Sequence, residues 1–331
     1  MIPSKIKKFF KNKKVIITGG TGLIGRSVVK KLCDFGSKVT VVSLDKFVVE
    51  KRAKHILGDL TNFEFCKKIT KNQDLAFHMA GIKGSVKVTI QKPSSFFVPL
   101  IMMNTNFLEA CRINKISRLV YTSSIGAYPS KEIFREKEST FDNQPMDMFP
   151  GWAKRMAELQ IQSYKKQYNL NKYFVVRPCN VYGPGDNFDP ENAMVIPTLI
   201  NRIFNKENPV NIWGDGSAIR DFAYSEDLAD GVILTLYYGT GKLDFLNLGG
   251  GKSYTIRKLV ETLSSFLEFK YKFDITKPSG FPKRVMDISN AKKIIGYKPQ
   301  FTLQKGLEET WNWYLKNRKE NKLRHNYFKN R

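Results

Sequence analysis

From residue 15 onward, short runs of β-branched and aliphatic residues alternate with longer runs whose apolar positions recur at helical spacing. The short runs predict strands, and the longer ones predict amphipathic helices. Strands that alternate with helices are typical of a parallel sheet covered on both faces, so we expect an α/β fold of the Rossmann type. The predicted strands span residues 15–18, 38–42, 75–79, 118–123 and 173–176, and the helices span residues 23–35, 107–113 and 151–168.

The pattern changes after residue 182, where Pro, Gly and Asn become frequent and short strands separate isolated helices. We interpret residues 13–182 as a first domain and residues 183–315 as a smaller α+β portion. Later segments are expected to return to the first domain, and residues 1–12 and 316–331 form basic ends. The helices predicted in this second half span residues 195–204, 256–267 and 303–316.

A glycine-rich loop joins the first predicted strand to the first helix, in the sequence Thr18-Gly19-Gly20-Thr21-Gly22-Leu23-Ile24-Gly25. Gly19, Gly22 and Gly25 have the spacing that permits a tight turn, close approach of the backbone to a pyrophosphate, and close packing of helix on strand. The helix N-terminus then points its positive dipole end at the phosphates. This context predicts a dinucleotide site.

The end of the second predicted strand bears on the choice of dinucleotide. Asp45 lies about 20 residues beyond Gly25, where an acid accepts the ribose 2′-hydroxyl of NAD. Ser43 stands at the usual strand end, however, and three nearby cations suit the 2′-phosphate of NADP. We therefore favour NAD and keep NADP as the alternative. The three cations are Lys46, Lys51 and Arg52.

The chain carries a formal charge of +25, and about half of the excess lies in the two basic ends. Binding of nucleic acid or an anionic membrane is one interpretation. The other is a Lys-rich solvated surface with frayed ends. We favour the second, because no nucleic-acid recognition motif accompanies the charge.

The remaining composition points to a cytoplasmic protein without a metal. The four cysteines are widely spaced and form no CxxC pair, as expected for reduced thiols. The three histidines do not cluster. No apolar run is long enough to cross a bilayer, and we expect neither a signal peptide nor membrane association.

Seven motifs taken together resemble the extended short-chain dehydrogenase/reductases, the NAD-dependent epimerase/dehydratase group that acts on nucleotide-diphosphate sugars. Within that group the chain is most similar to GDP-fucose synthase-like members. The motifs are Thr18–Gly22, Gly58-Asp59-Leu60, His78-Met79-Ala80-Gly81, Thr122-Ser123-Ser124, Lys154, Arg177–Pro184 and Trp213-Gly214-Asp215-Gly216.

The resemblance implies roles for individual residues. NAD or NADP would be held by the glycine loop and the ends of the following strands, with Lys154 on the nicotinamide ribose. Asp59 would reach the adenine, although it could equally cap a helix. The implied cofactor residues are Gly19, Thr21, Gly22, Leu23, Ile24, Gly25, Asp45, Asp59, Leu60, Ala80 and Lys154.

The resemblance also implies a nucleotide-sugar site. Arg220 would clamp the diphosphate with its planar guanidinium, and Arg284 would supply a second cation. Arg202 and Arg284 could instead be surface ion-pair partners, and Val195 and Leu199 could be the buried face of a helix. The implied substrate residues are Ser124, Asn180, Val195, Leu199, Arg202, Trp213, Arg220 and Arg284.

The chain leaves the family pattern at the catalytic centre. Ser124 and Lys154 match the catalytic Ser/Thr and Lys, but the family's Tyr, four residues before the Lys, is replaced by Pro150. Tyr128 and Tyr182 are alternatives, although the family uses tyrosines there for packing. Three further positions that carry acid–base or relay groups in relatives are also changed. They match Leu100, Gly126 and Met194.

These observations leave three hypotheses. The first, which we favour, is an enzyme with altered acid–base groups that modifies a nucleotide-diphosphate sugar, such as a GDP-sugar. The second is a non-catalytic protein that binds nucleotide sugar or dinucleotide. The third is association with nucleic acid or membrane through the basic ends. The resemblance also implies a homodimer formed through residues 94–113 and 151–168.

Overall fold

The computed structural model describes residues 2–82, 84, 86–138, 142–241, 243–325 and 327. Within these ranges a parallel sheet of seven strands has the order β11-β7-β5-β4-β1-β2-β3, so residues 246–248 return to the sheet built by the first part of the chain. The expected doubly wound α/β fold is confirmed. The strands are β1 (Lys14–Thr18), β2 (Lys38–Ser43), β3 (Lys54–Leu57), β4 (Leu75–His78), β5 (Arg118–Thr122), β7 (Tyr173–Pro178) and β11 (Leu246–Leu248).

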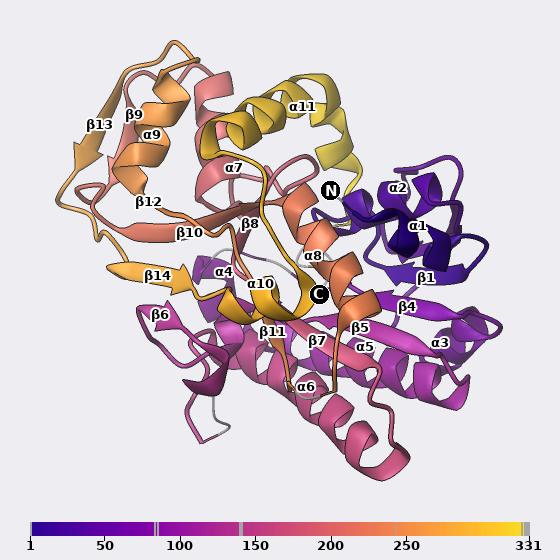
Figure 1. The fold of residues 1–331 in the computed structure, drawn as a ribbon. Helices are drawn as coiled ribbons and strands as arrows, with labels where there is room; N and C mark the ends of the chain where they lie inside the picture. The colour runs from indigo at the N-terminus through magenta and orange to yellow at the C-terminus, as the bar shows by residue number, and fades with distance from the viewer. Residues whose placement is uncertain are drawn as a thin grey trace.

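Helices cover both faces of this sheet (Figure 1). One face carries α3 (Phe63–Thr70), α5 (Pro93–Ile113) and α6 (Met148–Tyr168), and α4 (Val86–Gln91) precedes α5. The other face carries α2 (Gly25–Asp34) and α8 (Ser225–Tyr238), with α10 (Ser289–Ile295) against α8. The core strands β1 and β4 are almost fully buried, because they are covered on both faces.

Two helices differ from the sequence expectation. Helix α5 begins at Pro93 rather than at residue 107. It continues through Pro99, which is buried in the core. Proline usually breaks a helix, so the pattern before residue 107 gave no helical signal. Helix α8 was not predicted, because its residues are buried on nearly all sides and it lacks a polar face.

The second half of the chain builds a smaller mixed portion above the sheet edge (Figure 1). Its main sheet contains β6 (Ile133–Phe134), β8 (Asn180–Tyr182), β10 (Ile219–Tyr224), β12 (Ser253–Thr255) and β14 (Lys283–Met286). A separate pair is formed by β9 (Val210–Trp213) and β13 (Tyr271–Asp274). Helices α7 (Val195–Phe204), α9 (Ile256–Ser264) and α11 (Leu303–Leu323) pack around them over a second hydrophobic core.

The basic ends are folded where the structure describes them. Residues 4–10 form α1 (Ser4–Phe10), whose Ile6 and Phe10 are buried in the main core. Helix α11 extends past residue 316 to Leu323. Fraying is therefore wrong for these segments, because each has apolar or ion-paired side chains that anchor it.

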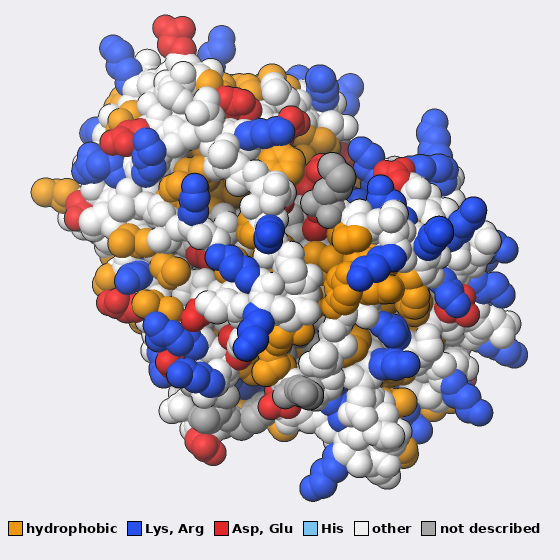
Figure 2. Space-filling view, in the orientation of Figure 1, with side chains coloured by type: hydrophobic (Ala, Val, Ile, Leu, Met, Phe, Trp, Pro, Cys, Tyr) orange, Lys and Arg blue, Asp and Glu red, His pale blue; other side chains and the backbone are white. Residues whose placement is uncertain are grey.

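The surface charge is spread rather than concentrated on the face drawn in Figure 2, where Lys and Arg side chains lie over both portions of the molecule. None of the helices in the described ranges combines the length and apolarity needed to cross a bilayer.

Candidate cofactor and nucleotide-sugar site

In the loop between β1 and α2, the positions of Gly19 and Gly25 have no room for a Cβ atom. Gly19 adopts φ +66°, and a Cβ there would lie 2.7 Å from the backbone of Ala80 on the neighbouring strand end. A Cβ on Gly25 would overlap the carbonyl oxygen of Gly19. The helix therefore starts directly against β1 and leaves a backbone-lined cradle, as a pyrophosphate requires.

A cavity opens beside this cradle at the carboxyl ends of β1, β2 and β4. Seven of the implied cofactor residues line it: Gly19, Thr21, Gly22, Asp45, Asp59, Leu60 and Ala80. Leu23, Ile24, Gly25 and Lys154 do not line this cavity. Its wall also contains residues to which the sequence analysis gave no cofactor role, namely Val42, Ser43, Leu44, Gly58, Met79, Gly81, Ile82, Met103, Asn187, Asp189, Asn192, Arg324, His325 and Tyr327.

Asp45 is held at the end of β2 by its neighbours. Its carboxylate accepts a hydrogen bond from Thr21 Oγ1 at 2.6 Å and from the backbone N–H of His325 at 2.8 Å. Because a carboxylate has about four acceptor positions, Asp45 can still receive a ribose hydroxyl. Arg52, considered above as a 2′-phosphate ligand, instead pairs with Glu50 at 2.7 Å and Asp34 at 2.8 Å.

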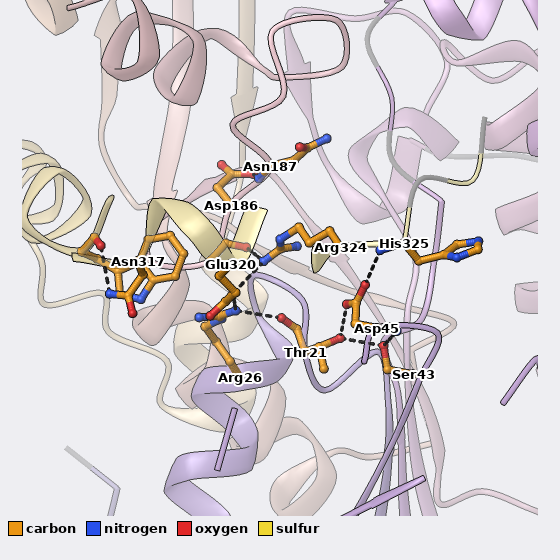
Figure 3. A network of polar contacts seen from close by, with 12 residues as sticks. Thr21, Arg26, Ser43, Asp45, Asp186, Asn187, Asn317, Glu320, Arg324 and His325 are labelled. Atoms are coloured by element: carbon orange, nitrogen blue, oxygen red, sulfur yellow. Dashed lines mark hydrogen bonds and ion pairs between the residues drawn. The ribbon is translucent and has the colours of Figure 1, made fainter. Parts of the chain in front are cut away.

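Residues close to the C-terminal end of the chain line this cavity, which the sequence analysis did not predict. Arg324 donates to the carbonyl oxygen of Gly185 at 2.6 Å, and the following residue reaches Asp45 (Figure 3). Helix α11 is fixed below them by an ion pair between Glu320 and Arg26 of α2. No motif marks residues 324–327, so only the folded chain reveals them.

Lys154 lies on the second turn of α6, close to the same cavity. Its Nζ donates to the carbonyl oxygen of Thr122 at 2.8 Å and lies 5.0 Å from the centre of the Tyr121 ring. A Cβ on Gly81, a cavity residue, would lie 3.5 Å from Nζ. Burial lowers the pKa of Lys154 to about 8, with Glu158 opposing the shift. The position agrees with a role beside the nicotinamide half of a cofactor.

No tyrosine takes the place of the missing one in the described part of the site. Pro150 is the third residue of α6, where its missing N–H costs little. Tyr128 is buried and donates to Asn247 Oδ1 at 2.9 Å, and Tyr182 is buried and donates to the Leu303 carbonyl oxygen at 3.4 Å. Both phenols therefore serve packing.

A carboxyl that the sequence did not indicate lies beside Ser124 and Gly126. Asp147 is exposed at the start of α6, and its Oδ2 fills the space that a side chain on Gly126 would occupy. The Oγ of Ser124 accepts the N–H of the same Gly126 at 3.0 Å, so the carboxyl and the hydroxyl flank one residue. Although the residue as a whole is exposed, its carboxyl packs against Gly126, and the resulting loss of solvation raises the pKa of Asp147, with Arg284 opposing the shift.

Asp147 immediately precedes α6 and lies in sequence register with Pro150 and Lys154 of that helix. It precedes Lys154 by seven residues, which is close to two helical turns, and Pro150 lies between them on the same stripe. The sequence gave no sign of a catalytic role for Asp147, because an Asp directly before a helix usually caps that helix. Asp147 makes no side-chain capping bond to α6.

A buried polar network lies one helical turn after Leu100. Leu100 is buried in the core, whereas Asn104 Oδ1 accepts a hydrogen bond from His78 Nε2–H at 3.0 Å and the Asn104 amide N–H donates to Tyr121 Oη at 3.0 Å. Thr18 Oγ1 completes this chain of polar groups with His78 Nδ1 at 2.7 Å. The polar network thus connects β1, β4 and α5 behind the cofactor cavity.

Arg220 and Arg284 form a pair of cations on neighbouring strands. They are register partners of β10 and β14, so their side chains leave the same face of the sheet. Burial and the proximity of Arg284 lower the pKa of Arg220. Arg284 Nε is buried without a hydrogen-bond partner among the described residues. Two adjacent guanidinium groups of this kind suit a diphosphate.

The other implied substrate residues are more dispersed. Asn180 donates to the backbone carbonyl of Asp221 at 3.2 Å, and Leu199 is buried in the second core, with Val195 packed against that core. Arg202 is paired with Glu207 at 2.7 Å and with the Asn211 carbonyl oxygen at 2.8 Å. Trp213 is 64% exposed. Arg202 is therefore an ion-pair partner, and Leu199 lies on the buried face of α7, which are the alternatives to a substrate role that the sequence left open.

Comparison with known proteins agrees with this geometry. Residues 15–249 match the model of the NAD dependent epimerase/dehydratase family. The chain belongs to this family. It is 30% identical to a probable GDP-L-fucose synthase 1 of Oryza sativa subsp. japonica over 93% of both chains, and 28% identical to a GDP-L-fucose synthase of Escherichia coli (strain K12), covering 92% of this chain and 97% of that protein.

The fold is shared with solved members of the epimerase group. The epimerase Mth375 of Methanothermobacter thermautotrophicus superimposes with a TM-score of 0.85 at 21% identity, over 96% of each chain. The family expectation and the expectation of a nicotinamide cofactor are therefore confirmed, because the family to which the chain belongs is NAD dependent.

Proposed function

We propose that this protein modifies the sugar of a nucleotide diphosphate, with GDP-sugars as the substrate class, in an epimerase- or reductase-type reaction. The adjacent guanidinium groups of Arg220 and Arg284 carry this proposal, because two neighbouring, half-buried cations suit an anion with two charges, such as a diphosphate. The relatives named GDP-L-fucose synthase favour a guanine nucleotide.

The cradle at Gly19 and Gly25 fits the pyrophosphate of a nicotinamide dinucleotide, and the bound nicotinamide would give or accept hydride. Lys154 would hold the nicotinamide ribose from α6. We favour NAD over NADP, because Asp45 is placed to accept a 2′-hydroxyl and Arg52 is engaged with two acids.

In this proposal Asp147 supplies the acid–base chemistry that the missing Tyr performs in relatives. Its carboxylate would take the proton of the sugar hydroxyl while the hydride leaves the same carbon, and the protonated carboxyl would return it in the reverse direction. Ser124, on the other side of Gly126, would hold the reacting oxygen. A carboxyl with a raised pKa is suited to such exchange near neutral pH.

We also propose a homodimer formed through α5 and α6. These helices pack on each other and leave Val98, Met102, Met156 and Leu159 exposed by 37–50%. An apolar stripe of this kind on a helix pair suits a matching pair from a second copy. We place the protein in the cytoplasm, in keeping with four free and buried cysteines.

The proposal is tested by mass spectrometry of products formed in deuterated water. The purified protein is incubated with GDP-, UDP-, dTDP- and CDP-sugars, including 4-keto intermediates, and with NAD(H) or NADP(H). We expect a mass change or deuterium incorporation with a GDP-sugar. Turnover restricted to another nucleotide would overturn the substrate class, and binding without turnover would favour the non-catalytic alternative.

A further inference from the structure

The C-terminal segment joins two walls of the cofactor cavity that the sequence places far apart. The backbone N–H of His325 donates to Asp45 at the end of β2, and Arg324 donates to Gly185 in the loop after β8. Arg324, His325 and Tyr327 line the cavity together with Gly22 of the glycine loop (Figure 3). The segment therefore forms a wall of the same space as the phosphate cradle.

Ion pairs hold this segment against α2. Glu320, in the last turns of α11, pairs with Arg26 of α2 and lies 3.5 Å from Arg324. Arg26 also donates to the Thr21 carbonyl oxygen at 3.0 Å and stacks on Trp313 of α11 at 5.0 Å. These contacts fix the end of α11 directly against the first turn of the nucleotide-binding helix.

The two guanidinium groups at this point keep donors without partners. Glu320 is shared by both, and the Nε atoms of Arg26 and Arg324 are buried without a hydrogen-bond partner among the described residues. Burial, with a smaller effect of Arg26, lowers the pKa of Arg324, although the carboxylates of Asp45, Glu320 and Asp186 oppose the shift. A phosphate oxygen in the cavity would accept from the unpartnered Nε–H of Arg324.

We propose that Arg324, His325 and Tyr327 are part of the dinucleotide site and that Arg324 binds a phosphate group of the cofactor. This inference rests on the proposed function, because it requires a dinucleotide in the cavity. The pyrophosphate and the 2′-phosphate of NADP share the chemistry that a guanidinium recognises. The fork of Arg324 keeps donors for either group after its bond to Gly185.

The test compares binding of NADH, NADPH and ADP-ribose by the full chain and by two variants, Arg324→Gln and a deletion of residues 324–331. Binding is followed by nicotinamide fluorescence or by calorimetry, without substrate. Lys319→Gln is the matched control, because Lys319 is an exposed cation in the same region of α11. Melting temperatures confirm that the variants are folded.

We expect Arg324→Gln and the deletion to weaken binding about tenfold or more, as for loss of a charge-assisted hydrogen bond, and Lys319→Gln to leave it unchanged. A loss for all three ligands assigns Arg324 to the pyrophosphate, and a loss for NADPH alone assigns it to the 2′-phosphate. Unchanged binding by both variants would overturn the inference.

Tighter binding by the deletion variant would also overturn it, because the segment would then be a cover that competes with the cofactor. If the full chain and both variants bind none of the ligands, the proposed function fails and the inference fails with it. That outcome is distinct, because the inference alone fails only when the full chain binds.

Discussion

At the scale of single residues, the sequence predicts that Pro150 replaces the family's Tyr, and our proposal requires another residue to exchange protons there. The structure removes Tyr128 and Tyr182 as substitutes, because both phenols are buried and hydrogen bonded away from the site. It brings Asp147 to the position vacated by the side chain at Gly126. The Asp147 carboxyl fits at this place only because residue 126 is glycine and has no Cβ.

Replacing Asp147 with Asn tests this role. We expect turnover to fall about 10²–10⁴-fold, because an amide cannot exchange a proton, while binding of GDP and NADH is unchanged. The wild-type rate should fall as pH drops below the raised pKa of Asp147, whose closest opposing charge is Arg284, and the variant should lack this dependence. Asp142→Asn, an exposed acid on the loop before α6, is the control.

Restoring the family residue provides a second test at the same site. Pro150→Tyr places a phenol on the stripe that carries Asp147 and Lys154, where the buried ammonium favours the phenolate. We expect this change to recover activity in the Asp147→Asn background. Recovery would not occur if the loss came from a misfolded α6, and thermal melting separates the two cases.

At the scale of secondary-structure elements, strand register brings together the residues that we propose bind the diphosphate. Arg220 and Arg284 are separated widely in sequence and become neighbours only because β10 and β14 pair in parallel. The same principle places Asp45 beside His325, through the packing of α11 on α2. Chemistry in this protein therefore depends on where elements end and which elements lie next to each other.

Neutralising either arginine should weaken nucleotide binding. For Arg220→Gln and Arg284→Gln we expect the affinity for GDP to fall about tenfold or more, as each change removes charge-assisted contacts to the diphosphate. The melting temperature should not fall, because each change also relieves repulsion between the cations. Arg257→Gln, on α9, is the matched control, and equal affinities in a calorimetric titration of all three variants would contradict the assignment.

At the scale of the whole molecule, the fold combines two cores and leaves an apolar stripe on α5 and α6. The main core buries a polar network in which His78 is fully enclosed between β1 and α5. Burial, together with repulsion from Lys154, lowers the pKa of His78 to about 3. The buried histidine affects the stability of the protein, and the apolar stripe affects its oligomeric state.

The buried histidine makes stability depend on pH. Between about pH 3 and 6.5 the unfolded chain binds a proton at His78 that the folded chain does not, so the free energy of unfolding falls as the pH falls. The expected contribution is up to about 1.4 kcal/mol per pH unit. His78→Gln should be less stable near pH 7 but should lose this slope in urea titrations, whereas His55→Gln should keep it.

The apolar stripe predicts the oligomeric state. We expect the wild-type protein to be a dimer in solution and the double change Met102→Glu, Met156→Glu to be a folded monomer, because charged groups cannot be buried in the paired helices. Light scattering after size exclusion measures the mass. Leu315→Glu, a comparably exposed position on α11, should remain dimeric, and a monomeric wild-type protein would contradict the interface.

The sequence by itself determined the parallel sheet, the glycine cradle and the family, because strand and helix periodicity and the turn at Gly19–Gly25 are local properties. It also predicted that Pro150 stands at the position of the family's catalytic Tyr. Tertiary structure alone decided what surrounds these parts: Asp147 beside Gly126, Arg220 beside Arg284, and Arg324 beside the cofactor cavity. These contacts join residues from different elements, and no pattern along the chain encodes packing between distant segments.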